Sequence, residues 1–398
     1  MSRTGVWMAI AIFACNTVAF NTGYATAPEA IHGANGMVAS RSQIASVVGA
    51  TILSEGGNAI DAAVAVGFAL AVTYPSAGNL AGGGFMLIRL ADGTVVANDH
   101  RETAPAAASR DMYLDAEGNL IKGRSTETHL AVGVPGTVHG LLTVLERYGT
   151  MDRAEVIKPA ENLANRGFML PRDMALDIAR RASLFAQHPG SKKQFSAPDG
   201  TPFKPGDVFV QKDLGETLKA IRVKGIAGFY EDRIADLLVA EMERGGGLIT
   251  LKDLADYRSV WRTPLEGTYR GHKIVSMPPP SSGGVLLIQM LNMLEPYDVK
   301  SMGYGSADAI HLLIEAERRA YADRAEHLGD SDFYPVPVEQ MISKAYAAKR
   351  FSDFNALKAT RSDAVGAGEV PWESPDTTHA SVIDRHGNAV SYTTTLNT

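Results

Sequence analysis

Asp376-Thr377-Thr378-His379-Ala380-Ser381-Val382-Ile383-Asp384 is the stretch that decides how this 398-residue chain is interpreted. Pro375-Asp376 is typical of a turn, and the alternation that follows predicts a strand. The hydroxyl of an internal threonine is a weak nucleophile, because it has no base of its own. At a new chain start, an α-amine with a pKa of about 8 lies beside the hydroxyl and can take its proton. We therefore predict that the Asp376–Thr377 bond is cut and that Thr377 becomes an N-terminal nucleophile.

The residues after Thr377 form a predicted hairpin. Residues 380–383 and 389–395 alternate around Asp384-Arg385-His386-Gly387-Asn388. We expect residues 389–395 to form an exposed edge of the sheet. His379 points to the same side as Thr377, but we predict no catalytic role for it, because the α-amine already supplies a base.

The composition is that of an ordinary globular protein and excludes several functional classes. The chain is 45% hydrophobic and 21% charged, with a net charge of -6 and no basic stripe, so nucleic acid is not an expected partner. The single cysteine, Cys15, excludes a disulfide framework. The ten histidines form no zinc-binding pattern, so we expect neither a catalytic metal nor a cofactor.

The first residues are typical of a secretory signal. Arg3 is followed by an apolar run over residues 6–14, which is too short to span a bilayer, and Ala25-Thr26-Ala27 has the pattern of a cleavage site. Lipidation at Cys15 is an alternative with a weaker motif. We predict a signal peptide over residues 1–27 and export to the periplasm or the exterior.

The middle of the chain predicts helices and strands in mixed order. Asn58 can cap a buried helix over residues 59–72, and strands over residues 85–90 and 94–99 form a hairpin that ends in Asp99-His100-Arg101-Glu102-Thr103-Ala104-Pro105. A phosphate loop is disfavoured for the glycine run 78–84, because the run enters a strand and lacks the P-loop lysine. The remaining expectations are strands over residues 37–40, 131–134 and 269–277, helices over residues 44–52, 285–294 and 307–328, and an exposed connector over residues 355–375.

Two further groups of polar residues have simple structural interpretations. Ser281 and Ser282 lack the Gly-x-Ser-x-Gly elbow of a serine nucleophile and are predicted to lie in a rigid loop. Asp323 and Arg324 are predicted to belong to an internal charge network on the long helix.

Several of these motifs together resemble the γ-glutamyltranspeptidase family. They are Met37-Val38-Ala39-Ser40, Gly56-Gly57-Asn58-Ala59, Asp61 to Ala65, Arg101 to Pro105, Pro278 to Gly284, Ala322-Asp323-Arg324, Gly329-Asp330 and Thr377-Thr378-His379. The resemblance covers about residues 33–398. It implies an α+β fold, the αββα sandwich of N-terminal-nucleophile hydrolases, and a precursor that cuts itself into a large and a small chain. It also implies transfer of the γ-glutamyl group of glutathione to water or to amino-acid or dipeptide acceptors.

The resemblance also implies roles for individual residues. Thr377 matches the nucleophile, Thr395 the threonine that hydrogen-bonds the nucleophile hydroxyl, and Asn397 the asparagine near the glutamyl α-amino and carboxylate groups. Arg101 matches the arginine that binds the substrate α-carboxylate. Ala81 stands where the family has a further glycine.

The expected organisation is a signal peptide over residues 1–27, a large-subunit region over 28–376 and a truncated start of the small subunit over 377–398. The family's small subunit runs on further and holds acidic residues, a Ser-Ser pair and the Gly-Gly of the oxyanion hole. We therefore expect an incomplete sandwich and no activity from this chain alone. Two alternatives stay open: a cephalosporin (glutaryl) acylase with the same nucleophile, and an inactive truncated remnant or binding protein.

Overall fold

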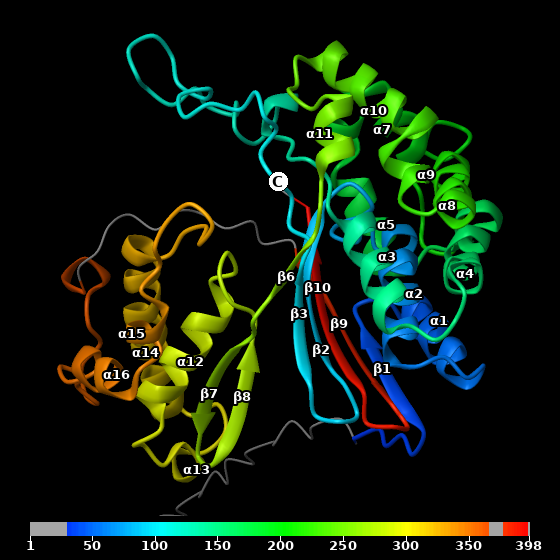
Figure 1. Cartoon of the computed structure of the whole chain (residues 1–398). Helices are drawn as coiled ribbons and strands as arrows, with labels where there is room; N and C mark the ends of the chain where they lie inside the picture. The colour runs from blue at the N-terminus through cyan, green and yellow to red at the C-terminus, as the bar shows by residue number, and fades with distance from the viewer. Residues whose placement is uncertain (1–29, 366–376, 397–398) are drawn as a thin grey trace, which may run out of the picture. The chain divides into compact units, whose positions relative to one another are not determined.

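The computed structural model describes residues 30–365 and 377–396, and Figure 1 shows the arrangement of their helices and strands. The chain divides into residues 1–34 and residues 35–398, and the description below concerns the second unit. The predicted signal peptide over residues 1–27 lies outside the described residues. Within those residues, no helix is long and apolar enough to cross a membrane.

The centre of this unit is a six-stranded antiparallel sheet in the order β1-β9-β10-β2-β3-β6. Its strands are β1 (Gly36–Ser40), β2 (Gly83–Arg89), β3 (Val95–Asp99), β6 (Val260–Arg262), β9 (Thr377–Asp384) and β10 (Ala389–Thr395). The expectation that residues 389–395 form an exposed edge is wrong. β10 pairs along its length with β9 on one side and β2 on the other, so both rows of its main-chain groups have partners.

The turns of the two central hairpins follow from their residues. Gly93 closes the β2–β3 turn with φ +91°, and Gly387 closes the β9–β10 turn with φ +83°, a conformation that favours glycine. Asp384 fixes the second turn, since its Oδ1 accepts hydrogen bonds from the main-chain N–H groups of His386 and Asn388. Its Oδ2 accepts from the Ala59 N–H and so ties the hairpin to a helix.

A helical layer covers one face of the sheet, as Figure 1 shows. Its centre is α2 (Ala59–Thr73), which is buried along its whole length and contacts β9 and β10. Asn58 and Asp61 form a capping box at its start, as the sequence predicted for Asn58. Gly49 lets α1 (Gln43–Ser54) approach α2 closely, because a Cβ there would lie 2.6 Å from Val66. The neighbouring helices are α3 (Thr137–Tyr148), α4 (Arg153–Arg166) and α8 (Lys212–Lys224).

The other elements are short or lie further from the sheet. They are η1 (His129–Ala131), β4 (Phe168–Met169), α5 (Arg172–Arg180), α6 (Ala182–Phe185), α7 (Pro189–Phe195), β5 (Val208–Phe209), α9 (Ala227–Tyr230), α10 (Asp232–Gly245), α11 (Leu251–Asp256), β7 (Leu265–Tyr269), β8 (His272–Ser276), α12 (Gly283–Leu294), α13 (Val299–Met302), α14 (Ala307–His327), α15 (Val338–Met341), α16 (Lys344–Arg350) and η2 (Ser362–Ala364).

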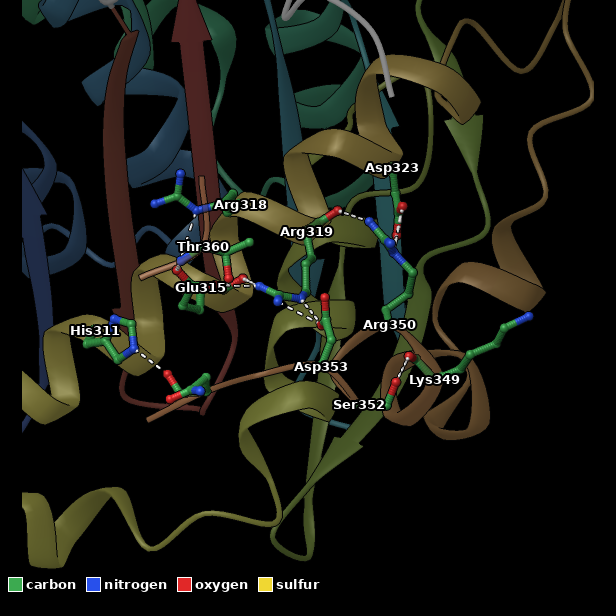
Figure 2. Close-up of polar contacts among 11 residues, drawn as sticks. His311, Glu315, Arg318, Arg319, Asp323, Lys349, Arg350, Ser352, Asp353 and Thr360 are labelled. Atoms are coloured by element: carbon green, nitrogen blue, oxygen red, sulfur yellow. Dashed lines mark hydrogen bonds and ion pairs between the residues drawn. The ribbon is translucent and has the colours of Figure 1, made fainter. Parts of the chain in front are cut away.

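A second core lies between α12, α14 and α16 and contains a buried ionic network (Figure 2). Arg319 of α14 is 1% exposed and pairs with Glu315 at 2.7 Å and with Asp353 at 2.7 Å. One turn further on, Asp323 pairs with Arg350 at 2.9 Å. The predicted internal network on this helix is confirmed for Asp323; Arg324 donates from Nε to the Ser282 hydroxyl at 3.1 Å.

Two local predictions are corrected. Residues 131–134 form no strand; η1 ends at Ala131, and Val134 makes an isolated bridge with Thr103. Residues 269–277 are not one strand, since the Arg270-Gly271 turn separates β7 from β8. The exposed connector predicted over residues 355–375 is confirmed for its described part, since residues 355–359 and 361–364 are exposed; the Thr360 N–H donates to Glu315 at 2.9 Å.

Candidate functional site

The strand register brings distant residues into one row across the sheet. Thr377 at the start of β9 lies opposite Thr395 of β10, and Thr395 lies opposite Gly83 of β2. Gly84 and His100 exchange main-chain hydrogen bonds of 3.3 and 3.0 Å, so the next pair in register is Gly83 and Arg101. We call Thr377, Thr395, Gly83 and Arg101 the site row; in Figure 1 their four strands run side by side.

The next row along the strands faces the helical layer. Thr378 and Thr394 are buried, as is His100, which follows β3. Because side chains alternate along a strand, the site row belongs to the opposite face of the sheet, where His379 and Ser381 are exposed. Of Thr377 itself, the structure describes the strand position. Asn397, the other predicted substrate-binding residue, lies outside the described residues.

Arg101 is held through its main chain, while its side chain is exposed. Its N–H donates to Asp99 Oδ1 at 3.0 Å, and its carbonyl accepts from the Tyr257 hydroxyl at 2.9 Å. The guanidinium carbon lies 5.9 Å from the centre of the Phe85 ring. Among the residues that the structure describes, this guanidinium makes no ion pair. It therefore has the geometry to bind a carboxylate from a ligand.

The carboxylate of Asp99 is neutralised from the other side. Its Oδ2 lies 2.6 Å from Arg262 Nε, and Arg262 also pairs with Asp332 at 2.8 Å. Asp99 can therefore orient the Arg101 main chain through one oxygen while Arg262 occupies the other.

Behind Arg101, the buried imidazole of His100 is uncharged at neutral pH. Burial, assisted by repulsion from His139, lowers the pKa of His100 to about 3. His100 Nδ1 lies 2.9 Å from Asn98 Oδ1, and its ring stacks on Tyr392 with centroids 5.9 Å apart. Burial also raises the pKa of Glu102, whose carboxylate packs against Gly83. The neutral His100 ring therefore adds no second positive charge beside Arg101.

Thr395 is held by a residue to which the sequence analysis assigned no role. Its carbonyl accepts from Asn79 Nδ2 at 2.9 Å, and its hydroxyl donates to the Leu396 carbonyl at 3.1 Å. Asn79 lies within the glycine run 78–84, which the sequence analysis considered only as a phosphate loop. The position of Asn79 just before a predicted strand is the sequence feature that could have indicated a structural role.

His379 lies two residues from Thr377 on the same strand. Its Nδ1 lies 2.8 Å from the Thr393 hydroxyl and its Nε2 lies 3.1 Å from the Ser381 hydroxyl. Partial burial lowers the pKa of His379. That His379 is not the catalytic base stays a prediction. In residues 30–365 and 377–396, no three His, Cys, Asp or Glu side chains are grouped to hold a metal ion.

Comparison with known proteins defines the family. The model of the gamma-glutamyltranspeptidase family matches residues 45–398. The glutathione hydrolase proenzyme of Escherichia coli (strain K12) is 50% identical over 370 residues, which are 92% of this chain and 64% of that protein. The acylase ACY 1 proenzyme of Pseudomonas sp. (strain SE83) is 43% identical over 371 residues, 92% of this chain and 66% of that protein. Among solved structures, the gamma-glutamyltranspeptidase of Helicobacter pylori is 45% identical with a TM-score of 0.83, covering 85% of this chain and 97% of that chain.

The fold and these likenesses are those of the N-terminal-nucleophile hydrolase fold class, which confirms the predicted fold class. Within that class, the chain belongs to the γ-glutamyltranspeptidase family. It spans just under two thirds of the length of the glutathione hydrolase proenzymes of Pseudomonas sp. (strain A14) and Escherichia coli.

Proposed function

We propose that this chain is part of a γ-glutamyltransferase and glutathione hydrolase that cuts itself between Asp376 and Thr377. The observation that carries the proposal is the register that sets Thr377 opposite Thr395, in one row with Arg101. A nucleophile, its hydroxyl partner and a carboxylate-binding cation then lie at the same end of neighbouring strands. The names of the similar proenzymes, glutathione hydrolases among them, support the same assignment.

The proposed reaction uses Thr377 twice. In the precursor, its hydroxyl attacks the Asp376 carbonyl and the C–N bond breaks, so the peptide becomes an ester and the α-amine is freed. Water then hydrolyses this ester, which releases the Asp376 carboxylate and restores the Thr377 hydroxyl. In the cut protein, the hydroxyl attacks the γ-amide carbonyl of glutathione while the α-amine takes the proton. The leaving amine departs, and water or an amino-acid or dipeptide acceptor then cleaves the acyl-Thr377 ester.

Arg101 is assigned to the α-carboxylate of the γ-glutamyl group, where a guanidinium can form two parallel hydrogen bonds. We assign Asn397 to the α-amino and carboxylate region and Thr395 to the nucleophile hydroxyl. We further propose that residues 1–27 direct export to the periplasm or the exterior. Residues 28–376 and the chain that starts at Thr377 would then form a heterodimer after cleavage.

A glutaryl acylase is the second candidate, because acylase ACY 1 is 43% identical over most of the chain. A glutaryl group keeps the terminal carboxylate of a γ-glutamyl group and lacks only its α-amine. Arg101 suits both groups, so the amine is the feature that discriminates between them.

The test compares γ-glutamyl-p-nitroanilide with glutaryl-p-nitroanilide on the protein made from the whole reading frame that contains these 398 residues. The proposal predicts a kcat/KM at least roughly tenfold higher for the γ-glutamyl compound. The glutaryl compound lacks the α-amine, so the groups that bind this amine would be left unpaired, which costs more than about 1.4 kcal/mol of transition-state binding. A preference for the glutaryl compound would establish the acylase instead. No turnover of either compound would contradict both candidates.

A further inference from the structure

Asn79 lies directly behind the site row and binds one of its members, Thr395. Its side chain is 6% exposed, and its Nδ2 lies 2.9 Å from the Ala77 carbonyl, 3.0 Å from the Thr394 hydroxyl and 2.9 Å from the Thr395 carbonyl. Its Oδ1 accepts from the Gly82 N–H at 2.8 Å and from the Thr137 hydroxyl at 2.6 Å. One buried amide therefore joins the end of β10 to the residue before β2.

The orientation of this amide is determined by groups that have only one hydrogen-bonding role. The Gly82 N–H can only donate, so the atom that faces it must be the amide oxygen. The Ala77 and Thr395 carbonyls can only accept, so the atom that faces them must be the amide nitrogen. The Thr394 hydroxyl donates to the Gly83 carbonyl at 2.9 Å and can accept from Asn79.

Gly82 shows how closely these segments pack. A Cβ at Gly82 would lie 2.4 Å from the Thr395 carbonyl oxygen and 2.7 Å from the Asn79 side chain. The Gly82 carbonyl accepts from the N–H groups of Gly136 and Thr137 at 2.8 and 3.0 Å. The start of α3 therefore holds Gly82, which in turn contacts Asn79. Because Gly82 packs this closely, the distance between β10 and β2 can change little.

We infer that Asn79 is a positioning residue that holds Thr395 in place opposite Thr377, through the Thr395 carbonyl and the Gly82 amide. The inference rests on the proposed role of Thr377 as nucleophile. Asn79 does not belong to the site row, so its effect is expected in the chemical step and not in substrate binding.

The test replaces Asn79 by Asp in the protein made from the whole reading frame. Asn79→Asp keeps the shape and the accepting oxygen, but an ionised carboxylate cannot donate to the Thr395 carbonyl. We expect kcat on γ-glutamyl-p-nitroanilide to fall roughly 10- to 100-fold, with KM changed less than about threefold. The rate of cleavage at Asp376–Thr377 should fall as well, since the same hydroxyl attacks.

The pH dependence separates positioning from a general loss of stability. Burial raises the pKa of a carboxyl group, and the protonated acid can again donate a hydrogen bond. The ratio of variant to wild-type kcat should therefore rise about tenfold between pH 8 and pH 5.5.

The matched control is Asn292→Asp on α12. Asn292 is 7% exposed, and its Nδ2 donates to the Ile342 carbonyl at 2.7 Å, so the control loses the same kind of bond far along the chain from the site row. Its kcat and KM should stay within about threefold of the wild type at every pH. If Asn79→Asp does not fold, Thr137→Val, which removes only the hydroxyl bond to Asn79, should still lower kcat at least about threefold.

Three outcomes would overturn the inference. An Asn79→Asp protein with wild-type kcat and cleavage rate would do so, as would a ratio of kcat values that does not change with pH, or a Thr137→Val protein with wild-type kcat. A wild-type protein that cuts itself but does not turn over γ-glutamyl compounds would contradict only the proposed substrate. The cleavage rates of the wild type and of Asn79→Asp would then test the positioning role of Asn79. A wild type without cleavage or turnover contradicts the proposed function and the inference together.

Discussion

The guanidinium of Arg101 reaches solvent from a main chain that is fixed on both sides, by Asp99 and by Tyr257. A side chain that must bind a charged group benefits from such a fixed base, because less freedom is lost when the ligand binds. The main chain of Thr395 is fixed in a similar way, because Asn79 donates a hydrogen bond to its carbonyl. At these two residues, main-chain hydrogen bonds place the groups that we assign to the substrate and the nucleophile.

Replacing Arg101 by Ala should lower kcat/KM for γ-glutamyl-p-nitroanilide by roughly 30- to 1000-fold, or about 2–4 kcal/mol of transition-state binding. Arg101→Lys should recover only part of this loss, because an ammonium cannot form the two parallel bonds. Arg89→Lys is the control, since Arg89 is exposed near the other end of β2. Steady-state kinetics of the three variants measure the effect, and an Arg101→Lys protein equal to the wild type would show that Arg101 has a structural role.

The buried ring of His100 makes the free energy of unfolding depend on pH. Burial lowers the pKa of His100 from 6.5 to about 3, so between these values the unfolded chain binds a proton that the folded chain does not. The stability that comes from the neutral ring is complete above pH 6.5 and is lost as the pH falls. From pH 7 to pH 5, the wild type should lose about 2 kcal/mol more free energy of unfolding than His100→Gln does.

Urea unfolding at the two pH values measures this difference. His272→Gln serves as control, because His272 is exposed on β8 and its replacement should leave the pH dependence as in the wild type. Parallel pH dependences for His100→Gln and the wild type would contradict the buried neutral ring.

At the scale of elements, α14 carries an ion pair between Glu315 and Arg319 that is almost excluded from water, and Arg319 has a second, exposed partner (Figure 2). The side chain of Glu315 is 0% exposed, and that of Asp353, which pairs with the same Arg319, is 68% exposed. Burial alone would raise the pKa of Glu315, but hydrogen bonds from Thr360 and Arg319 hold it at about 2. The two carboxylates are therefore partners of one cation in very different surroundings.

Glu315→Gln should lower the free energy of unfolding by about 3–5 kcal/mol, because it leaves a buried charge poorly compensated. Asp353→Asn should cost about 1 kcal/mol or less, since water screens that pair. Denaturant titrations of the two variants give the comparison. Equal losses would mean that burial does not decide the strength of the network.

At the scale of the whole molecule, the sequence predicted local elements better than their assembly. The Asn58 cap of the buried helix α2 and the turn residues of the β9–β10 hairpin are local signals, and both predictions are confirmed. The pairing of β10 with β2 joins residues about 300 positions apart, and no local pattern specifies such a partner. This is why the predicted edge at β10 is wrong.

In the site, too, residues within sequence motifs were predicted, and residues that act through contacts distant in sequence were missed. Thr377, Thr395 and Arg101 were predicted from motifs that resemble a known family, and the register brings their positions into one row. Asn79 and Tyr257 were missed, because their importance comes from hydrogen bonds to residues that are 316 and 156 positions away in sequence. A buried amide or hydroxyl has no sequence period that would reveal such a contact.

The most direct test of the account is the N-terminal residue of the smaller chain after cleavage. The whole reading frame is expressed as wild type, Thr377→Ala and Thr377→Ser, and the products are separated on a denaturing gel and sequenced from their N-termini. We predict that the wild-type smaller chain begins with Thr377. Thr377→Ser should also cut, since it keeps a hydroxyl, and Thr377→Ala should remain one chain. Two chains from Thr377→Ala, or a wild-type smaller chain that begins at another residue, would contradict Thr377 as the nucleophile.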